Sequence, residues 1–462
     1  MKRIETMTDF AVSRNPTTGD ILASYPMQNA SELEQALSTS AAAFKKWQKS
    51  SMASRVTVLR QLGHQLRERE PELTRMITLE MGKPVAQARA EILKCANLCD
   101  WYAEFGPAML EDQPSQVPDA WQSFRPIGVI LAVMPWNFPF WQVLRGAVGM
   151  LLAGNTYLLK HAPNVMGSAT LMAELFDATD LPKGGFNLIN VDNEGVSTAI
   201  KDDRIAAVAV TGSVRAGAAI AAQAGAALKK TVLELGGSDP FIVLADADLD
   251  EAVKSAVTGR YQNTGQVCMA AKRFIIEASI AEAFEARFVE AVKALKIGDP
   301  LNEDTYIGPM ARADLRDELD QQVQASLREG ARLVLGGEKI AGQGNYYAPT
   351  ILSDVTSEMT AFRQELFGPV AAIAVARDAE HALEIANNSD FGLSATVWTG
   401  DEHMAARMSE ELEVGAVFIN GNGASDPRVT IGGVKKSGYG RELSHFGVHE
   451  FCNVQTIWKN RR

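Results

Sequence analysis

The chain has 462 residues, of which 46% are hydrophobic and 37 are glycine, a composition typical of an α/β protein with more than one domain. Its net charge is −11 at pH 7 and its Lys and Arg residues form no run, which argues against a nucleic-acid-binding surface. Its four cysteines are scattered, which argues against a disulfide scaffold and favours a reducing compartment.

The N-terminal segment, residues 1–7, carries charged and polar side chains and lacks the apolar core of a signal peptide. The most apolar run, residues 127–134, stops at Pro135 and is far shorter than the roughly 20 residues that a membrane span needs. We therefore expect a cytoplasmic protein with no membrane segment and no nucleic-acid partner.

Residues 30–103 show an apolar spacing that predicts several long helices, with Ser51 as a plausible helix cap. Cys95 and Cys99 lie one helical turn apart without a second pair at metal-ligand spacing, so we interpret them as core residues. Residues 107–124 lack this periodicity, which indicates an excursion away from the main core.

From Gly128 onward, short β-rich runs alternate with helical patterns. Strands are expected at 129–134, 156–160, 186–190 and 205–211, and helices at 140–152, 168–176, 195–200 and 216–228. This alternation predicts a parallel, doubly wound sheet, which binds nucleotides at the carboxyl ends of its strands.

A second alternating set follows. Strands are expected at 241–244, 273–277, 332–335, 370–375, 395–398 and 416–420, and helices at 249–258, 280–295, 313–329, 379–387 and 402–409. The sequence thus predicts an α/β protein with two sheet domains, the second of which contains Cys268. The tail, residues 451–458, is typical of an added edge strand and favours a homodimer or homotetramer.

Cys268 follows a turn that contains Gly265 and precedes an apolar run, with Lys272 and Arg273 nearby. A thiol is a nucleophile only as the thiolate, which a partly electropositive turn favours. Glu234 ends another β-like run just before two glycines, where a strand end opens onto a cleft. Both residues also have plainer interpretations, because most cysteines are small buried hydrophobes and Glu234 could simply pair with Lys272.

Three further segments suit a nucleotide site. The turn Thr211-Gly-Ser213 lies between a strand and an Ala-rich helix, where N–H groups and the helix dipole can bind a phosphate, although such turns are often purely structural. Lys160 ends a strand, so its ammonium group lies at the same sheet edge or in solvent. Asn137, between Pro135 and Pro139, is either a functional amide or a structural one in a rigid loop.

These segments, and the order in which they follow one another, resemble those of the aldehyde dehydrogenase superfamily. The resemblance covers nearly the whole chain. The matching pieces are Pro135-Trp-Asn-Phe-Pro139, Lys160, Thr211-Gly-Ser213, Glu234-Leu-Gly-Gly237, Cys268 in its turn, Glu365-Leu-Phe-Gly-Pro369 and Gly432-Gly-Val-Lys-Lys-Ser-Gly438. The resemblance implies an aldehyde dehydrogenase-like α/β fold with a Rossmann-type cofactor domain, an α/β catalytic domain and a small β oligomerisation arm.

The resemblance assigns residues 1–106 and 125–235 to the cofactor-binding domain and residues 236–430 to the catalytic domain. Residues 107–124 and 431–462 become oligomerisation segments. In the family, the segment that matches 107–124 pairs with the C-terminal tail across a subunit interface.

The resemblance also implies a reaction. Cys268 would attack an aldehyde, and the oxyanion would be held by the Asn137 side-chain amide and the Cys268 backbone N–H. Hydride would pass to NAD or NADP, and Glu234 would activate the water that hydrolyses the thioester; relatives that pass the acyl group to coenzyme A lack this base. His445 and His449 have helix-turn spacing without the Glu of a zinc protease motif, so we expect a surface or interface segment there and no metal.

The cofactor contacts that the resemblance implies come from several segments. They are Trp136, Asn137, Lys160, His161, Ala162, Pro163, Gly212, Ser213, Leu235, Glu365 and Phe367. Pro163 stands where NAD-preferring members have a Glu that would repel a 2′-phosphate, so both NAD and NADP are expected to be usable.

Arg145, on the helix after Asn137, is the main substrate clue, because a cation that faces the aldehyde tunnel would bind a distal carboxylate; a surface or interdomain arginine is the alternative. Arg145 and Ser425 match carboxylate-binding positions of succinate-semialdehyde dehydrogenases, while Gln262 stands where those enzymes have a second arginine. Trp141 is a candidate for the tunnel wall. We therefore expect succinate semialdehyde as substrate, with lactaldehyde or glutarate semialdehyde next, and a non-catalytic nucleotide-binding protein of the same fold as a less favoured alternative.

Overall fold

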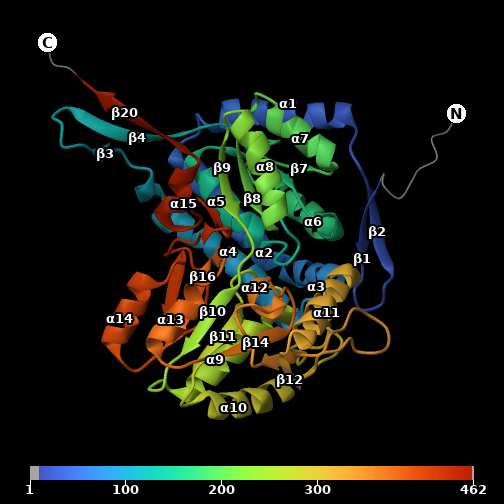
Figure 1. Ribbon diagram of the computed structural model, residues 1–462. Coiled ribbons are helices and arrows are strands. Elements are labelled where there is room, and N and C mark those ends of the chain that lie inside the picture. Colours follow the sequence, from blue (N-terminus) through green and yellow to red (C-terminus); the bar gives the residue numbers. More distant parts are fainter. Residues whose placement is uncertain (1–9, 460–462) are drawn as a thin grey trace.

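The computed structural model describes residues 10–459. Figure 1 shows a six-stranded sheet with its helices in the upper half of the molecule, a seven-stranded sheet with its helices in the lower half, and a three-stranded arm that projects to the upper left. Residues 1–9, on which the expected lack of a signal peptide depends, and residues 460–462 lie outside the described part.

The six-stranded sheet is built from the first strand and helix alternation. In spatial order its strands are β19 (Gly438–Tyr439), β9 (Lys230–Glu234), β8 (Ile205–Thr211), β5 (Val129–Val133), β6 (Thr156–Lys160) and β7 (Phe186–Ile189). The connecting helices are α5 (Trp141–Ala153), α6 (Met166–Asp177), α7 (Asn193–Lys201) and α8 (Val214–Ala226). All pairs are parallel except β19 with β9, so the expected parallel sheet is confirmed to within a few residues at each boundary.

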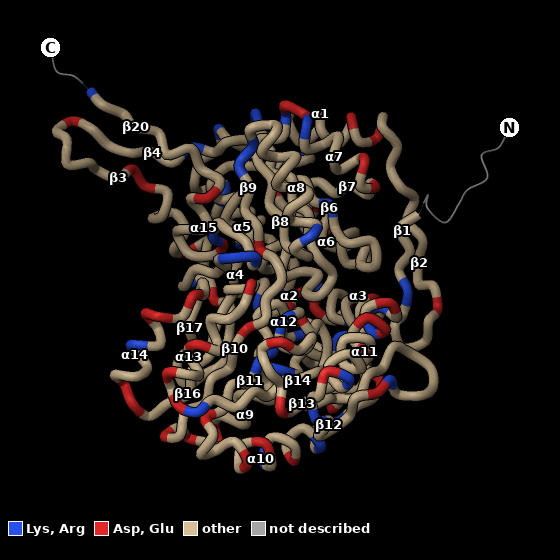
Figure 2. The backbone as a smooth tube through the Cα atoms, in the orientation of Figure 1, with Lys and Arg blue, Asp and Glu red and all other residues tan. Residues whose placement is uncertain are grey.

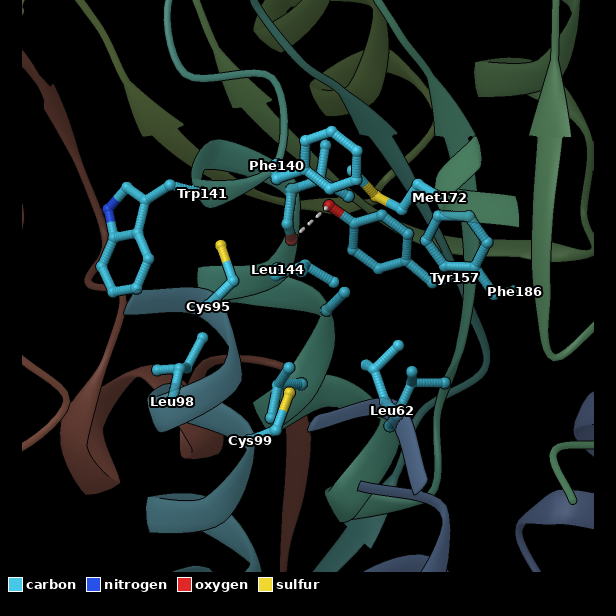
Figure 3. Close-up of a cluster of buried hydrophobic side chains, with 14 of the residues drawn as sticks. Leu62, Cys95, Leu98, Cys99, Phe140, Trp141, Leu144, Tyr157, Met172 and Phe186 are labelled. Carbon is cyan, nitrogen blue, oxygen red and sulfur yellow. Dashed lines mark hydrogen bonds between the residues drawn. The ribbon is translucent and has the colours of Figure 1, made fainter. Parts of the chain in front are cut away.

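Hydrophobic clusters cover both faces of this sheet, which explains why its strands are apolar throughout. The N-terminal helices that contribute to them are α1 (Ala30–Trp47), α2 (Met52–Glu68), α3 (Glu70–Met81) and α4 (Val85–Met109). Ser51 caps α2 by accepting a hydrogen bond from the Ser54 N–H at 3.1 Å, as expected. Cys95 and Cys99 of α4 are fully buried beside Leu98 and Leu144 (Figure 3), so their interpretation as core residues is confirmed.

The seven-stranded sheet contains, in spatial order, β12 (Arg332–Leu335), β13 (Thr350–Ser353), β14 (Val370–Ala376), β11 (Ala271–Glu277), β10 (Asp239–Val243), β16 (Ser394–Trp398) and β17 (Ala416–Ile419). Its helices are α9 (Leu249–Tyr261), α10 (Ala281–Lys293), α11 (Ala313–Arg328), α12 (Thr360–Arg363), α13 (Ala379–Asn387) and α14 (Glu402–Glu411). The analysis of the sequence missed β13, because four residues between irregular segments carry too little periodicity to predict a strand. It also missed the hairpin of β1 (Phe10–Arg14) and β2 (Ile21–Pro26).

The arm consists of β3 (Gln113–Pro114), β4 (Ala120–Pro126) and β20 (Cys452–Trp458). β20 pairs with β4 along its whole length within one chain, so the expected pairing of these two segments across a subunit interface is wrong. The reason is that α15 (Ser444–Glu450) packs on α5, and the Asn155 side chain holds the Phe451 carbonyl at 2.8 Å, which directs the tail onto its own β4. Residues 431–462 do not all join the arm either, since β19 extends the six-stranded sheet.

The remaining elements are a two-stranded pair, β15 (Phe391–Gly392) with β18 (Val434–Lys435), and the short 3-10 helices η2 (Pro163–Val165) and η3 (Gln262–Gly265). Figure 2 shows acidic and basic residues interspersed along outer helices such as α10, α11 and α14. Among residues 10–459, no helix is both long and apolar enough to span a membrane.

Candidate active site

Cys268 lies in the turn between η3 and β11, and the backbone of this turn is constrained. Asn263 and Thr264 adopt positive φ angles of 53° and 54°, which non-glycine residues rarely do, and Gly265 has φ 72°. A Cβ atom on Gly265 would lie 2.3 Å from the Gly368 carbonyl oxygen, so only glycine fits there. The buried Arg260 donates to the Gly265 carbonyl at 2.7 Å, which holds the turn in place.

The Cys268 thiol is not an acidic thiol in this arrangement. Lys272 Nζ lies below the turn and donates to the Cys268 and Val267 carbonyls at 2.6 and 3.1 Å. Burial raises the pKa of Cys268 to about 11, although the positive charges of Arg145 and Lys272 act in the opposite direction. The thiol therefore needs a proton acceptor, or a further lowering of its pKa by substrate or cofactor, to react as the thiolate at neutral pH.

Asn137 lies beside this turn and is tied to it by hydrogen bonds. Its side-chain Nδ2 donates to the Gln266 carbonyl at 3.1 Å, and its backbone carbonyl accepts from Asn263 Nδ2 at 2.9 Å. Since a side-chain amide carries two N–H groups, one donor of Asn137 remains for a ligand. The buried His161 ring packs under the same loop, with Nε2 2.9 Å from the Pro139 carbonyl.

Glu234, at the end of β9, carries a buried carboxyl group with an unusual environment. Its Oε2 lies 4.0 Å from Arg145 Nη2, and its Oε1 has no hydrogen-bond partner among the described residues. Arg145 in turn contacts Glu442, so one guanidinium group lies between two buried carboxylates. Burial raises the pKa of Glu234 to about 8 against the effect of Arg145, which leaves a carboxyl group suited to accept a proton near neutral pH.

The segment Gly432–Gly438 positions Glu234 rather than lining the site. β19 begins at Gly438, which pairs with Glu234, and a Cβ atom there would lie 1.9 Å from the Leu233 carbonyl oxygen. The Ser437 carbonyl accepts from the Leu235 N–H at 2.9 Å, and the Ser437 hydroxyl donates to the Gly236 carbonyl at 2.8 Å. These contacts fix the end of β9 and with it the carboxyl group.

Two cavities meet at Cys268. The first, which we call the crevice, has a volume of about 380 Å³ and opens at the carboxyl ends of β5, β8 and β9. The second, which we call the tunnel, has a volume of about 230 Å³ and lies between α4, α5, the Cys268 turn and the loop that follows β17. Cys268 and Gln142 line both cavities, so the two cavities adjoin at these residues.

The crevice has the shape and lining that a dinucleotide requires. Trp136 and Phe367 stand edge to face with ring centroids 5.7 Å apart and form an apolar wall. Ser213 caps the N-terminus of α8, whose first-turn N–H groups have no intrahelical partner, and a Cβ atom on Gly212 would meet open space. These features fit a flat aromatic ring at one end and a phosphate at the other.

Most of the expected cofactor residues line the crevice. They are Trp136, Asn137, Gly212, Ser213, Leu235, Glu365 and Phe367. Glu365 also pairs with Lys272 at 3.2 Å and accepts from the Gly237 N–H at 3.1 Å, so one of its oxygens is already engaged.

Residues 160–163, which were also expected to contact the cofactor, are not among the residues that line the crevice. They lie at the end of the neighbouring strand β6, where burial lowers the pKa of Lys160 and Pro163 is exposed. The His161 side chain is only 1% exposed and points into the core, so it is not available to a ligand. The sequence could not show this, because a strand-end histidine can point to either face.

The four expected substrate residues, Arg145, Gln262, Ser425 and Trp141, all line the tunnel together with Cys268. Arg145 differs from the expectation, because it is already paired with Glu442 and its side chain is 2% exposed. The alternative pairing of Glu234 with Lys272 is also wrong, since Lys272 pairs with Glu365.

One tunnel residue was missed by the analysis of the sequence. Lys94, on α4 one position before Cys95, places its Nζ 2.8 Å from the Ser425 hydroxyl and 4.0 Å from the centre of the Trp141 ring. The only signal in the sequence was a lysine among apolar residues of a buried helix, and this signal does not indicate a partner 331 residues away.

Comparison with known proteins defines the class to which this fold and site belong. The family model described as "Aldehyde dehydrogenase family" matches residues 5–457. The chain therefore belongs to the aldehyde dehydrogenase family, and the expected family and fold are confirmed.

Within this family, the chain is similar to individual proteins that carry more specific names. The chain is 64% identical over 453 residues, 98% of each chain, to a protein named succinate semialdehyde dehydrogenase [NAD(P)+] from Escherichia coli strain K12. It is similar to the structure of succinic semialdehyde dehydrogenase from Streptococcus pyogenes in complex with NADP+, with a TM-score of 0.95, 35% identity and coverage of 97% and 100% of the two chains. It is also similar to a structure of lactaldehyde dehydrogenase, with a TM-score of 0.94, 33% identity and coverage of 98% and 96%.

Proposed function

We propose that this protein oxidises succinate semialdehyde to succinate with NAD or NADP. The observation that carries the proposal is the meeting of two cavities at Cys268, one lined by Glu234 and an aromatic wall and the other by cationic side chains. A reaction that joins a dinucleotide and an anionic aldehyde at one sulfur atom requires this arrangement. The 64% identical relative from Escherichia coli carries the corresponding name.

The first step is addition of the Cys268 thiolate to the aldehyde carbon, which forms a tetrahedral thiohemiacetal anion. The second N–H of the Asn137 amide and the Cys268 backbone N–H stabilise the developing oxyanion, and each such donor is typically worth about 2.7–4 kcal/mol. Asn137 is 3% exposed, its side-chain amide donates to the Gln266 carbonyl and its backbone carbonyl accepts from Asn263, so the amide is oriented before substrate binds.

Trp136, Phe367 and Glu365 would hold a nicotinamide cofactor in the crevice, where it would supply the hydride acceptor. Loss of hydride would leave the carbon attached to Cys268 as a thioester. Glu234 then takes a proton from water, and the hydroxide attacks the thioester carbonyl, which releases the carboxylic acid and the Cys268 thiolate. The free Oε1 of Glu234 and its raised pKa support this role.

The proposed use of both cofactors depends on residue 163. Pro163 is exposed and carries no charge, so nothing at this position repels a 2′-phosphate. Lys160, at the end of the same strand, adds a cation that attracts one.

The division of labour in the chain is part of the proposal. Residues 1–106 and 125–235 bind the cofactor, and residues 236–430 carry the nucleophile. The arm, with Val454 and Trp458 exposed by 49% and 61%, is the surface on which a second copy would pack to give a homodimer or homotetramer in the cytoplasm. Light scattering on the full chain and on a chain ended after residue 451 tests the assembly, and equal masses would contradict it.

The experiment that tests the function is an aldehyde panel followed by absorbance of the reduced nicotinamide. Succinate semialdehyde, glutarate semialdehyde, lactaldehyde and butanal are each offered with NAD and with NADP. We expect the highest kcat/KM for succinate semialdehyde, with measurable rates for both cofactors. A preference for lactaldehyde would overturn the substrate, and lack of turnover with every aldehyde would favour a non-catalytic protein.

A further inference from the structure

We propose that Lys94, oriented by Ser425, binds the distal carboxylate of the aldehyde and supplies the substrate specificity of the tunnel. This inference rests on the proposed function and names the cation that selects an anionic substrate. It differs from the expectation drawn from the sequence, in which Arg145 and Ser425 hold that group.

The position of Lys94 is the first argument. Its side chain leaves α4 towards the tunnel, where Nζ donates to the Ser425 hydroxyl at 2.8 Å and lies 4.0 Å above the Trp141 ring. Lys94, Ser425 and Trp141 line the tunnel together with Cys268, so a molecule bound to the sulfur shares a cavity with the ammonium group. An ammonium group that rests on a ring and a hydroxyl retains donor capacity for a carboxylate.

The state of the other charged groups is the second argument. Arg145 also lines the tunnel, but it forms an ion pair with the buried Glu442 and lies 4.0 Å from Glu234, so its guanidinium group is already engaged. Glu91 is the acidic residue of the tunnel lining, and its oxygens are taken by Lys83 and by the Phe140 and Trp141 N–H groups.

By contrast, no carboxylate forms an ion pair with Lys94 in the part of the chain that the structure describes. Removing a charged group from water without a counter-ion is costly, so a partly buried, uncompensated ammonium group favours an anionic ligand. Gln262, on the opposite side of the tunnel, can add a hydrogen bond but no charge.

The charge of Lys94 is poised by its surroundings. Burial lowers its pKa to about 8, and Arg145 on α5 acts in the same direction, whereas Cys95 and Glu91 on α4 and Asp426 in the loop oppose the shift. The ammonium form therefore predominates at neutral pH and is lost as the pH rises above about 8. A substrate carboxylate would stabilise the charged form, so anionic substrates should bind less well at alkaline pH.

The test compares two aldehydes of equal carbon number. Succinate semialdehyde carries the distal carboxylate and butanal does not. The variant Lys94→Met keeps an unbranched side chain only one atom shorter and removes its charge. We expect the KM for succinate semialdehyde to rise about 10- to 100-fold, with kcat changed by less than about threefold and the KM for butanal changed by less than about threefold. An equal loss with both aldehydes, or no loss with either, would overturn the assignment.

Three further variants keep the test informative if Lys94→Met folds poorly. Lys94→Arg should restore most of the affinity, and Ser425→Ala should raise the KM for succinate semialdehyde about 3- to 10-fold. The matched control is Lys45→Met, which replaces an exposed lysine on α1 remote from the tunnel. This variant should leave the KM for both aldehydes unchanged. If Ser425→Ala leaves the discrimination between the two aldehydes intact, or if Lys94→Arg abolishes it, the proposal fails.

A pH series gives a readout that a structural role would not move. The ratio of kcat/KM for succinate semialdehyde to that for butanal cancels the titration of groups that serve both aldehydes. We expect this ratio to fall above pH 8 or so in the wild type and to stay level in Lys94→Arg, because arginine remains protonated. A fall that is identical in both proteins would contradict the role of Lys94.

The failure of this inference is distinguishable from failure of the proposed function. If the unmodified protein does not prefer succinate semialdehyde, the function is wrong whatever the variants do. If it does and Lys94→Met retains that preference, only the assignment of Lys94 is wrong.

Discussion

The crevice and the tunnel meet at the same sulfur atom but are built in different ways. The crevice is formed by strand ends and the turns that follow them, with Glu234 after β9 and Gly212 after β8. The tunnel is formed by side chains from α4, α5, the Cys268 turn and a loop near residue 425. A cavity built from strand ends can be predicted from local patterns, whereas one built from distant side chains cannot.

The two cavities also differ in charge. The crevice presents carboxyl groups, with Glu234 held largely protonated by burial at neutral pH and Glu365 paired with Lys272. The tunnel presents the uncompensated ammonium group of Lys94. This contrast assigns proton transfer to the crevice side and recognition of the anion to the tunnel side, and four changes test it.

The largest effect should come from the residue that both cavities share. Cys268→Ser replaces the nucleophile by a hydroxyl group that is far less reactive, so we expect kcat to fall by at least about 10⁴-fold for anionic and neutral aldehydes alike. Cofactor binding, measured by quenching of tryptophan fluorescence, should persist. A fall in kcat for only one of the two aldehydes would show that Cys268 contributes to substrate recognition and is not the nucleophile for both.

Glu234→Gln should impair the proton transfer assigned to the crevice and leave recognition of the substrate in the tunnel unchanged. Hydrolysis of the thioester should slow about 10³-fold, so that a burst of reduced cofactor precedes slow turnover, equally for all aldehydes. In the wild type, the rate of hydrolysis should rise with pH up to about 8 and then level off, because only the deprotonated carboxylate accepts the proton from water. Stopped-flow absorbance between pH 6 and pH 9, spanning that pKa, measures both; unaltered steady-state turnover in the variant would rule out Glu234 as the base.

Asn137→Ala should lower kcat about 10²-fold, since it removes one donor to the oxyanion while leaving the thiol in place. The loss should again be the same for succinate semialdehyde and butanal. Because Asn137 also donates to the Gln266 carbonyl, the thermal unfolding of the variant is the control. An altered ratio between the aldehydes would place Asn137 on the recognition side.

The smallest effect should come from a substitution at position 163, which is proposed to lie near the adenosine ribose of the cofactor. Pro163→Glu should raise the KM for NADP about tenfold through repulsion of the 2′-phosphate while leaving the KM for NAD nearly unchanged. Pro163→Gln, which is similar in size but neutral, is the matched control. Equal changes for both cofactors would mean that position 163 does not face the adenosine ribose.

Local patterns accounted for most of the fold. Each β-rich run from 129 to 211 became a strand of the six-stranded sheet, because burial on both faces requires continuous apolar residues. The turn of Cys268, the end of β9 and the Asn137 loop were predicted to converge, and all three line the crevice. The short strands β13 and β19 were missed, because two to four residues carry no measurable period.

By itself, the amino-acid sequence determined the alternating α/β architecture, since local apolar periodicity follows from burial of each element. Its motifs also indicated the family, and through that resemblance most of the residues of the crevice. Only the tertiary structure decided which tunnel cation has no carboxylate partner among residues 10–459. It brought Glu442 to Arg145 and Ser425 to Lys94, and it turned His161 into the core. The charge that a side chain offers to a ligand depends on partners hundreds of residues away, and packing alone selects those partners.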